Sequence, residues 1–186
     1  MAMTRIARWL RRLFAILVLI ALILAYAWIE EIGIGAREHG AAGQQVIVRD
    51  GDTLQIGKTE YRLSGIDAPE YRQDCADVAG RAWPCGRQAR SRLAALVATG
   101  DLGCTPRATD RYGRAIATCR AKGAPDIAEA MVAAGLAINE GGFGEGDYAG
   151  IEAEARAAKR GIWQGRFTPP AEWRAAHPRG GDQDGG

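Results

Sequence analysis

The stretch VRDGDTLQIGKTEYRLSGIDAPE, residues 48–70, decides the fold of this chain. Together with the residues just before it, it contains three short runs rich in apolar and β-branched residues, which predict strands over residues 45–50, 53–57 and 59–67. Asp50-Gly51 and Gly57-Lys58 separate these runs and favour turns or bulges. The stretch therefore predicts a small sheet of short strands that bend sharply at glycines.

Helical patterns follow farther along the chain. Apolar residues recur at helical spacing over residues 87–99, a short helix is expected after residues 125–126, and another from 147 to 161. Residues 102–120 predict a β-hairpin between the first two helices. The fold class is therefore α+β, and short curved strands favour a five-stranded OB-fold β-barrel with about three helices.

A separate signal lies at the amino terminus, where residues 13–29 form an unbroken apolar run of 17. Four arginines precede the run and two glutamates follow it. At about 1.5 Å per residue, such a run is at the lower edge of what crosses a hydrocarbon core roughly 30 Å thick, so a retained transmembrane helix and a cleaved signal peptide are both open. The arginines favour a cytoplasmic amino terminus. We expect a single-pass inner-membrane protein with a periplasmic domain or, after signal cleavage, a secreted or periplasmic one.

This reading divides the chain into four parts. Residues 1–31 are expected to be the membrane anchor or signal peptide, and the Gly- and Ala-rich residues 32–44 a linker. Residues 45–175 carry the folded domain, while residues 176–186 have too few apolar side chains to pack and are expected to be a disordered tail.

The four cysteines predict two disulfides, because a domain outside the cytoplasm meets oxidising surroundings. A turn over residues 110–113 would place Cys104 opposite Cys119 across the hairpin, at a Cα separation that a disulfide tolerates. Cys75 and Cys85 then remain to pair with each other. Four reduced, buried cysteines are the alternative if the domain stays in the cytoplasm.

Composition excludes several kinds of chemistry. The 186 residues include two histidines and two serines, neither serine lies in a Gly-x-Ser-x-Gly turn, and no Cys-x-x-Cys pair occurs. Serine hydrolases and zinc sites therefore lack their usual residues. Carboxylates and arginines must therefore carry any catalysis. With 24 Lys plus Arg against 22 Asp plus Glu, the overall charge does not identify the chain as a nucleic-acid binder.

Asp52, Asp67 and Glu70 bring three carboxylates into 19 residues, two of them beside Pro69. Such hard oxygen donors suit Ca²⁺, and a cation would relieve their mutual repulsion and act as a Lewis acid. Taken singly, these residues have simpler roles, because Asp52 could belong only to a turn and the other two could cap local backbone.

Five short motifs occur in a fixed order. They are Asp-Gly-Asp-Thr at 50–53, an arginine at 62, Asp-Ala-Pro-Glu at 67–70, Asp-Arg-Tyr-Gly-Arg at 110–114 and Gly-Ile-Trp at 161–163. In this order the chain resembles the thermonuclease family, that is, staphylococcal nuclease and its relatives, over roughly residues 45–165. The resemblance implies a Ca²⁺-dependent, sugar-nonspecific endonuclease that hydrolyses phosphodiester bonds in single- or double-stranded DNA and RNA. The amino-terminal segment would make it an envelope-targeted member.

The resemblance also implies a metal site in this chain. Asp52 and Asp67 would be direct Ca²⁺ ligands, and the backbone carbonyl of Ala68 would be another. The type member of the family has threonine at the position of Ala68, so a side-chain hydroxyl is absent here while the carbonyl remains.

Three further residues would perform the reaction. Glu70 would be the general base that takes a proton from the attacking water. Arg62 and Arg114 would donate paired hydrogen bonds to the phosphorane oxygens, since a guanidinium stays charged at any relevant pH.

Substrate contacts are expected from Arg111, Tyr112 and Phe143. The type member stacks nucleotides on tyrosines, whereas this chain has mainly Phe143 in the corresponding stretch. The other partner predicted is the membrane, through residues 13–29, and no protein partner is predicted. The alternative function is a noncatalytic OB-fold module that binds nucleic acid or a protein partner in the envelope.

Overall fold

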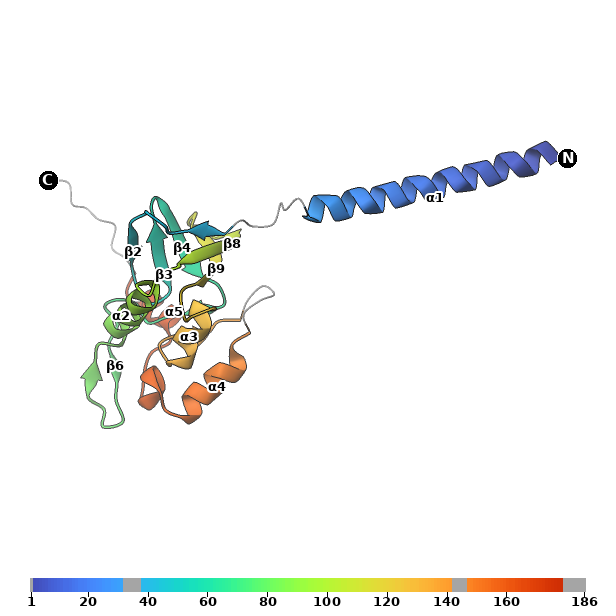
Figure 1. Ribbon diagram of the computed structural model, residues 1–186. Coiled ribbons are helices and arrows are strands. Elements are labelled where there is room, and N and C mark those ends of the chain that lie inside the picture. Colours follow the sequence, from blue (N-terminus) through green and yellow to red (C-terminus); the bar gives the residue numbers. More distant parts are fainter. Residues whose placement is uncertain (1, 32–37, 142–146, 179–186) are drawn as a thin grey trace. The chain divides into compact units, whose positions relative to one another are not determined.

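A computed structural model describes residues 2–31, 38–141 and 147–178 of the chain (Figure 1). The chain divides into two compact units, residues 1–37 and residues 38–186. In the first unit, Ala2–Glu31 form one continuous helix, α1. Across the described residues, no helix combines the length and the apolar character needed to cross a membrane.

This finding contradicts the predicted single-pass inner-membrane location and the predicted membrane contact through residues 13–29. The predicted location outside the cytoplasm was inferred from the same segment and loses that basis.

The second unit is built on a curled main sheet. Its described strands are β1 His39–Gly40, β2 Val46–Val48, β3 Thr53–Ile56, β4 Thr59–Leu63, β8 Gly103–Thr109 and β9 Ala115–Arg120. They lie in the order β1-β8-β9-β4-β3-β2. All neighbours are antiparallel except β4 and β9, which run parallel. That parallel pair joins the antiparallel β2–β3–β4 meander to the disulfide-bridged β8–β9 hairpin.

Smaller elements surround this sheet (Figure 1). Two further strand pairs are β5 Ile66–Asp67 with β10 Ile138–Asn139, and β6 Cys75–Ala76 with β7 Ala82–Trp83. The helices are α2 Cys85–Val97, α3 Ile127–Ala133, α4 Ala149–Ala157 and α5 Pro170–Ala176, with a 3₁₀ turn, η1, at Gly161–Gln164.

The core explains why β4 can serve both the fold and a site. Tyr61 and Leu63 point inward and are almost fully buried, together with Leu93 of α2 and Met131 of α3. Because side chains alternate along a strand, Arg62 between them faces the opposite side of the sheet. The packing of β4 therefore fixes the direction of one arginine.

The α+β class predicted from the sequence is confirmed, while details differ. The described part of the main sheet has six strands, not five, because His39–Gly40, inside the predicted linker, pairs with β8. Helix α5 was not predicted. It has only seven residues, too few to show helical periodicity, although Pro169-Pro170 at its start is a favourable helix-opening pair.

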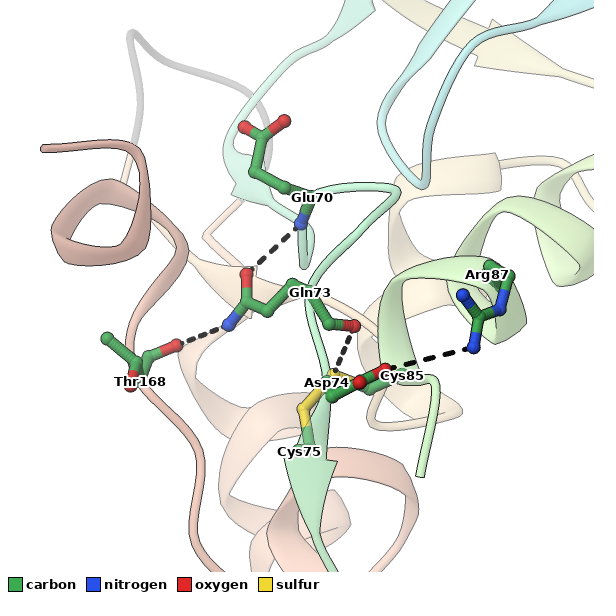
Figure 2. Close-up of a disulfide and its surroundings, with 7 residues drawn as sticks. All are labelled: Glu70, Gln73, Asp74, Cys75, Cys85, Arg87 and Thr168. Carbon is green, nitrogen blue, oxygen red and sulfur yellow. Dashed lines mark hydrogen bonds and ion pairs between the residues drawn. A yellow bond between two sulfur atoms is a disulfide. The ribbon is translucent and has the colours of Figure 1, made fainter. Parts of the chain in front are cut away.

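Both predicted disulfides are present. Cys104 and Cys119 are directly opposed in the β8–β9 register, with Cα atoms 4.1 Å apart. Cys75 and Cys85 join β6 to the start of α2, at a Cα separation of 5.6 Å (Figure 2). The second bridge ties the first turn of α2 to the chain that follows Glu70.

Candidate active site

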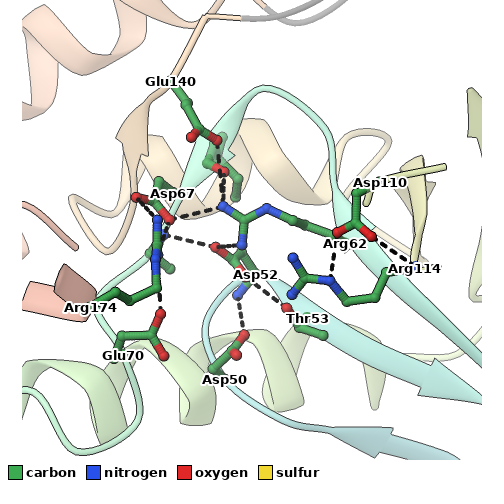
Figure 3. Close-up of polar contacts among 12 residues, drawn as sticks. Asp50, Asp52, Thr53, Arg62, Asp67, Glu70, Asp110, Arg114, Glu140 and Arg174 are labelled. Atoms are coloured by element: carbon green, nitrogen blue, oxygen red, sulfur yellow. Dashed lines mark hydrogen bonds and ion pairs between the residues drawn. The ribbon is translucent and has the colours of Figure 1, made fainter. Parts of the chain in front are cut away.

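Two buried aspartates meet one arginine at the end of the meander (Figure 3). Asp52 immediately precedes β3 and is 3% exposed, and Asp67 ends β5 and is 1% exposed. The Arg62 guanidinium bridges them, with Nη1 2.9 Å from Oδ2 of Asp52 and Nη2 2.9 Å from Oδ1 of Asp67. The structure thus brings together three of the predicted site residues.

The Asp52 carboxylate also joins the two turns that carry the acidic residues. Its Oδ1 accepts a hydrogen bond from the Thr53 hydroxyl at 2.8 Å. Its Oδ2 accepts one from the backbone N–H of Ala68 at 3.0 Å. The turn at 50–53 is therefore fastened to the turn at 67–70, which explains why two distant motifs share one site.

Helix α2 packs closely beneath both turns. A Cβ atom on Gly51 would lie 2.7 Å from the Cβ atoms of Ala68 and Ala89. A Cβ atom on Gly86 would overlap the backbone carbonyl of Glu70. Small residues at these positions let the helix contact the acidic turns directly. The small side chain of Ala68 therefore has a packing role, in addition to the role predicted for its backbone carbonyl.

Glu70 is positioned through its backbone. Its N–H donates to Oε1 of Gln73 at 3.1 Å, and Gln73 Nε2 donates to the Thr168 carbonyl at 2.7 Å (Figure 2). Gln73 is fully buried, and its carbonyl oxygen lies 3.4 Å from Sγ of Cys85. One glutamine therefore ties Glu70 both to the disulfide region and to the segment that leads into α5.

A further arginine enters the site from α5, and the sequence analysis missed it. Arg174 Nη1 and Nη2 bind Oδ1 and Oδ2 of Asp67 at 2.8 and 3.1 Å, and Nη1 also binds Oε1 of Glu70 at 3.1 Å (Figure 3). Asp67 and Arg174 are 107 positions apart. Pro169-Pro170 could have indicated a helix there, but no local pattern indicates where that helix docks.

Burial and neighbouring charge perturb this cluster. Burial and, next in size, the charge of Asp50 raise the pKa of Asp52 to about 7 against the opposing effect of Arg62. Burial opposes the charge of Arg62, yet Asp52 and Asp67 hold its pKa above the usual value. The hydrogen bond to Asp67 likewise raises the pKa of Arg174. Both guanidiniums therefore stay charged, while the pKa of Asp52 lies near neutral pH.

The ionised cluster has an excess of negative charge. Glu140, after β10, lies 3.4 Å from Arg62 and joins Asp52, Asp67 and Glu70. Four carboxylates against two guanidiniums leave a formal charge of −2, which a divalent cation would balance. These oxygen donors suit a hard cation. Over the described residues, however, no group of three or more His, Cys, Asp or Glu side chains is arranged to hold a metal ion, because guanidinium nitrogens lie between the carboxylates.

Arg114 lies on the same side of the sheet as Arg62 but has a different partner. Arg62 is paired with Ile116 in the parallel ladder, so Arg114, two residues earlier, shares its face. Its Nε donates to Oδ2 of Asp110 at 2.8 Å. The structure therefore places Arg114 on the same face as Arg62 without joining it to the carboxylate cluster.

The hairpin turn carries the predicted substrate-binding pair. Tyr112 is 69% exposed, and its ring lies 4.8 Å from Cζ of Arg111 and 5.6 Å from Cζ of Arg114. Arg111 also donates to the Tyr112 hydroxyl at 2.7 Å. Phe143, the predicted stacking residue, lies outside the described residues.

Comparison with known proteins places the chain in a family. The staphylococcal nuclease homologue family matches residues 60–165. The chain is 34% identical to the succinoglycan biosynthesis protein ExoI of Rhizobium meliloti (strain 1021), over 64% of this chain and 63% of that protein. It is 33% identical to an uncharacterized endonuclease of Escherichia coli O157:H7, over 71% and 84%. It is 30% identical to the staphylococcal-like nuclease CAN1 of Arabidopsis thaliana, over 76% and 41%.

The chain thus spans less than two thirds of the Rhizobium and Arabidopsis proteins. The family match nevertheless covers more than half of this chain and confirms the prediction of a thermonuclease-type enzyme. It includes four of the residues considered above, namely Arg62, Asp67, Glu70 and Arg114. The chain therefore belongs to the staphylococcal nuclease family, a family of nucleic-acid-cleaving enzymes.

Proposed function

We propose that this protein is a Ca²⁺-dependent, sugar-nonspecific endonuclease that hydrolyses phosphodiester bonds in DNA and RNA. The observation that carries the proposal is the buried cluster in which Arg62 bridges Asp52 and Asp67 beside Glu70. A buried group of like charges held on two fastened turns is costly for stability, and such arrangements concentrate at functional sites.

The donor set supports a hard divalent cation. Asp52 and Asp67 would hold it together with the carbonyl of Ala68, and nucleases of this family are generally Ca²⁺-dependent. When bound there, Ca²⁺ supplies Lewis-acid polarisation of a phosphodiester oxygen. The excess negative charge of the ionised cluster favours such an ion.

Glu70 is the general base of the proposed reaction. It takes the proton of a water molecule while the water oxygen attacks phosphorus. Its side chain is only 16% exposed, and its backbone is held by Gln73, so the carboxylate is presented from a fixed turn. That rigidity keeps the base within reach of the attacking water.

Arg62 and Arg114 stabilise the charge that develops on the phosphoryl oxygens. Both lie on one face of the sheet, and Asp110 orients the Arg114 guanidinium through Nε. Donors fixed before the reaction begins lower the barrier more than flexible ones. On the hairpin turn, the exposed Tyr112 ring with Arg111 beside it is suited to stack on a nucleotide.

The proposal is tested with the purified protein, supercoiled plasmid and a folded RNA, each in Ca²⁺ and in chelator. We expect both nucleic acids to be cleaved in Ca²⁺ and left intact in chelator. Equal cleavage in the two conditions would contradict the Ca²⁺ dependence. Absence of cleavage in Ca²⁺ would contradict the nuclease itself.

One observation favours the second candidate, a noncatalytic module that binds nucleic acid. Both Asp67 oxygens are already taken by guanidinium nitrogens, an arrangement that needs no metal. Binding of an oligonucleotide with no turnover in Ca²⁺, unchanged by Asp52→Asn, would support this function over the nuclease.

A further inference from the structure

Arg174 occupies the oxygens that the proposed metal site requires (Figure 3). Its two terminal nitrogens bind both oxygens of Asp67, at 2.8 and 3.1 Å, and one of them reaches Glu70 at 3.1 Å. A carboxylate oxygen offers two acceptor positions. Oδ1 of Asp67 already uses two, because Arg62 binds it as well at 2.9 Å. A cation cannot engage this oxygen while both guanidiniums remain in place.

The two arginines differ in how firmly they are held. Arg62 lies within β4 between the core residues Tyr61 and Leu63, and its side chain is 15% exposed. Arg174 lies on the last described helix and its side chain is 37% exposed. Of the two, only Arg174 can withdraw without disturbing the sheet.

Helix α5 is attached to the domain by few contacts. Of its seven residues, only Pro170 is buried, and the preceding segment is held through the hydrogen bond from Gln73 to the Thr168 carbonyl. Short elements with little buried surface undock at low free energy, well below that of global unfolding. The Arg174 fork is therefore a large part of what keeps α5 in place.

We infer that Arg174 is an internal substitute for the divalent cation: its guanidinium pairs with Asp67 and Glu70 in the metal-free protein, and Ca²⁺ must displace it to bind. This rests on the proposed function, whose metal site it regulates. Ca²⁺ and the Arg174 guanidinium compete for the same oxygens and repel each other, so binding of one opposes binding of the other. The protein then closes its own site when Ca²⁺ is scarce, and Ca²⁺ binding releases α5.

The first test is calorimetric titration of Ca²⁺ into the metal-free full chain. Arg174→Met should bind Ca²⁺ about tenfold more tightly than the wild type, since the competing cation is gone. Arg174→Lys should lie between the two, because it keeps the charge but not the fork. Arg81→Met is the matched control: it removes the same charge from an exposed residue paired with Asp77, and should leave the Ca²⁺ affinity unchanged.

The second readout is amide hydrogen exchange with and without Ca²⁺. In the wild type, Ca²⁺ should speed exchange in residues 171–177 while slowing it in residues 52–68. Unchanged or weaker Ca²⁺ binding by a folded Arg174→Met variant, or an α5 protected by Ca²⁺, would overturn the inference alone. No Ca²⁺ binding by any of these proteins would overturn the proposed metal site, and the inference with it.

Discussion

Asp52 shows how one residue can serve the site at the expense of the fold. It is buried, it fastens two turns through Thr53 and Ala68, and it is paired with the guanidinium of Arg62. Burial raises its pKa from the ordinary 3.8 to about 7, with Asp50 adding to the effect. An ionised Asp52 is therefore unfavourable in the folded chain unless a further cation is present.

This has a testable consequence for stability in the metal-free protein. Because the folded pKa is higher than the unfolded one, the folded chain binds the proton more tightly between about pH 4 and 7, and stability due to this group falls as pH rises through that window. Asp52→Asn removes the group. The wild type should therefore lose roughly 2 kcal/mol of unfolding free energy, relative to Asp52→Asn, as pH rises from 5 to 8. Urea unfolding in chelator measures this difference.

The matched control for this measurement is Asp74→Asn, at an exposed position near Arg87. It should follow the wild-type pH dependence. Parallel curves for Asp52→Asn and the wild type would contradict the perturbed state of Asp52.

At the scale of elements, the site depends on how closely α2 approaches the acidic turns. Gly86, in the first turn of α2, faces the Glu70 carbonyl, and its N–H donates to the Gln73 carbonyl at 3.0 Å. The Cys75–Cys85 bridge fixes the same turn of the helix. Glu70 is thus positioned by a helix, a disulfide and a buried glutamine together.

Gly86→Ala should displace Glu70, because the added Cβ overlaps backbone that cannot rotate away. We expect a loss of about 1–3 kcal/mol in the free energy of unfolding, as for other overpacked positions, and a fall in cleavage rate at temperatures where the variant is fully folded. Gly150→Ala, in α4 where nothing lies within 4 Å, is the control and should be neutral or stabilising. Full activity of Gly86→Ala would show that Glu70 tolerates movement of its turn.

The sequence predicted those features that depend on local pattern. Asp52, Arg62, Asp67 and Glu70 were expected from two acidic motifs and the arginine between them, and the structure gathers them in one cluster. The Cys104–Cys119 bridge followed from the symmetry of a hairpin about its turn.

What the sequence could not predict depends on contacts distant in the chain. The parallel pairing of β4 with β9 joins segments more than 50 residues apart, and Arg174 reaches Asp67 across 107 positions. No periodicity encodes such encounters. The membrane prediction rested on the apolar run of residues 13–29 and its flanking charges, and it is contradicted because no helix among the described residues has the length and apolar character to cross a membrane.

At the scale of the whole molecule, the amino-terminal boundary of the catalytic domain can be tested by truncation. The second compact unit begins at Glu38, whose carboxylate binds Arg120, and β1 follows at once. A fragment of residues 38–186 should therefore cleave plasmid within about twofold of the full chain, since the proposed site lies wholly within it.

A fragment of residues 45–186 lacks β1 and the Glu38–Arg120 pair. It should be less stable by about 1 kcal/mol, the worth of a few exposed hydrogen bonds and one ion pair, as measured by denaturant unfolding. Equal stability of the two fragments would place the boundary after β1.

The nuclease assignment as a whole depends on Glu70 acting as a base beside the Asp52–Arg62–Asp67 cluster. The most direct measurement is the rate of plasmid cleavage in Ca²⁺ by the wild type, by Glu70→Gln and by Glu154→Gln, an exposed control on α4. Glu70→Gln should lose a factor of about 10² to 10⁴ with its thermal unfolding midpoint preserved, while Glu154→Gln keeps the wild-type rate. Cleavage by Glu70→Gln at the wild-type rate would contradict the account.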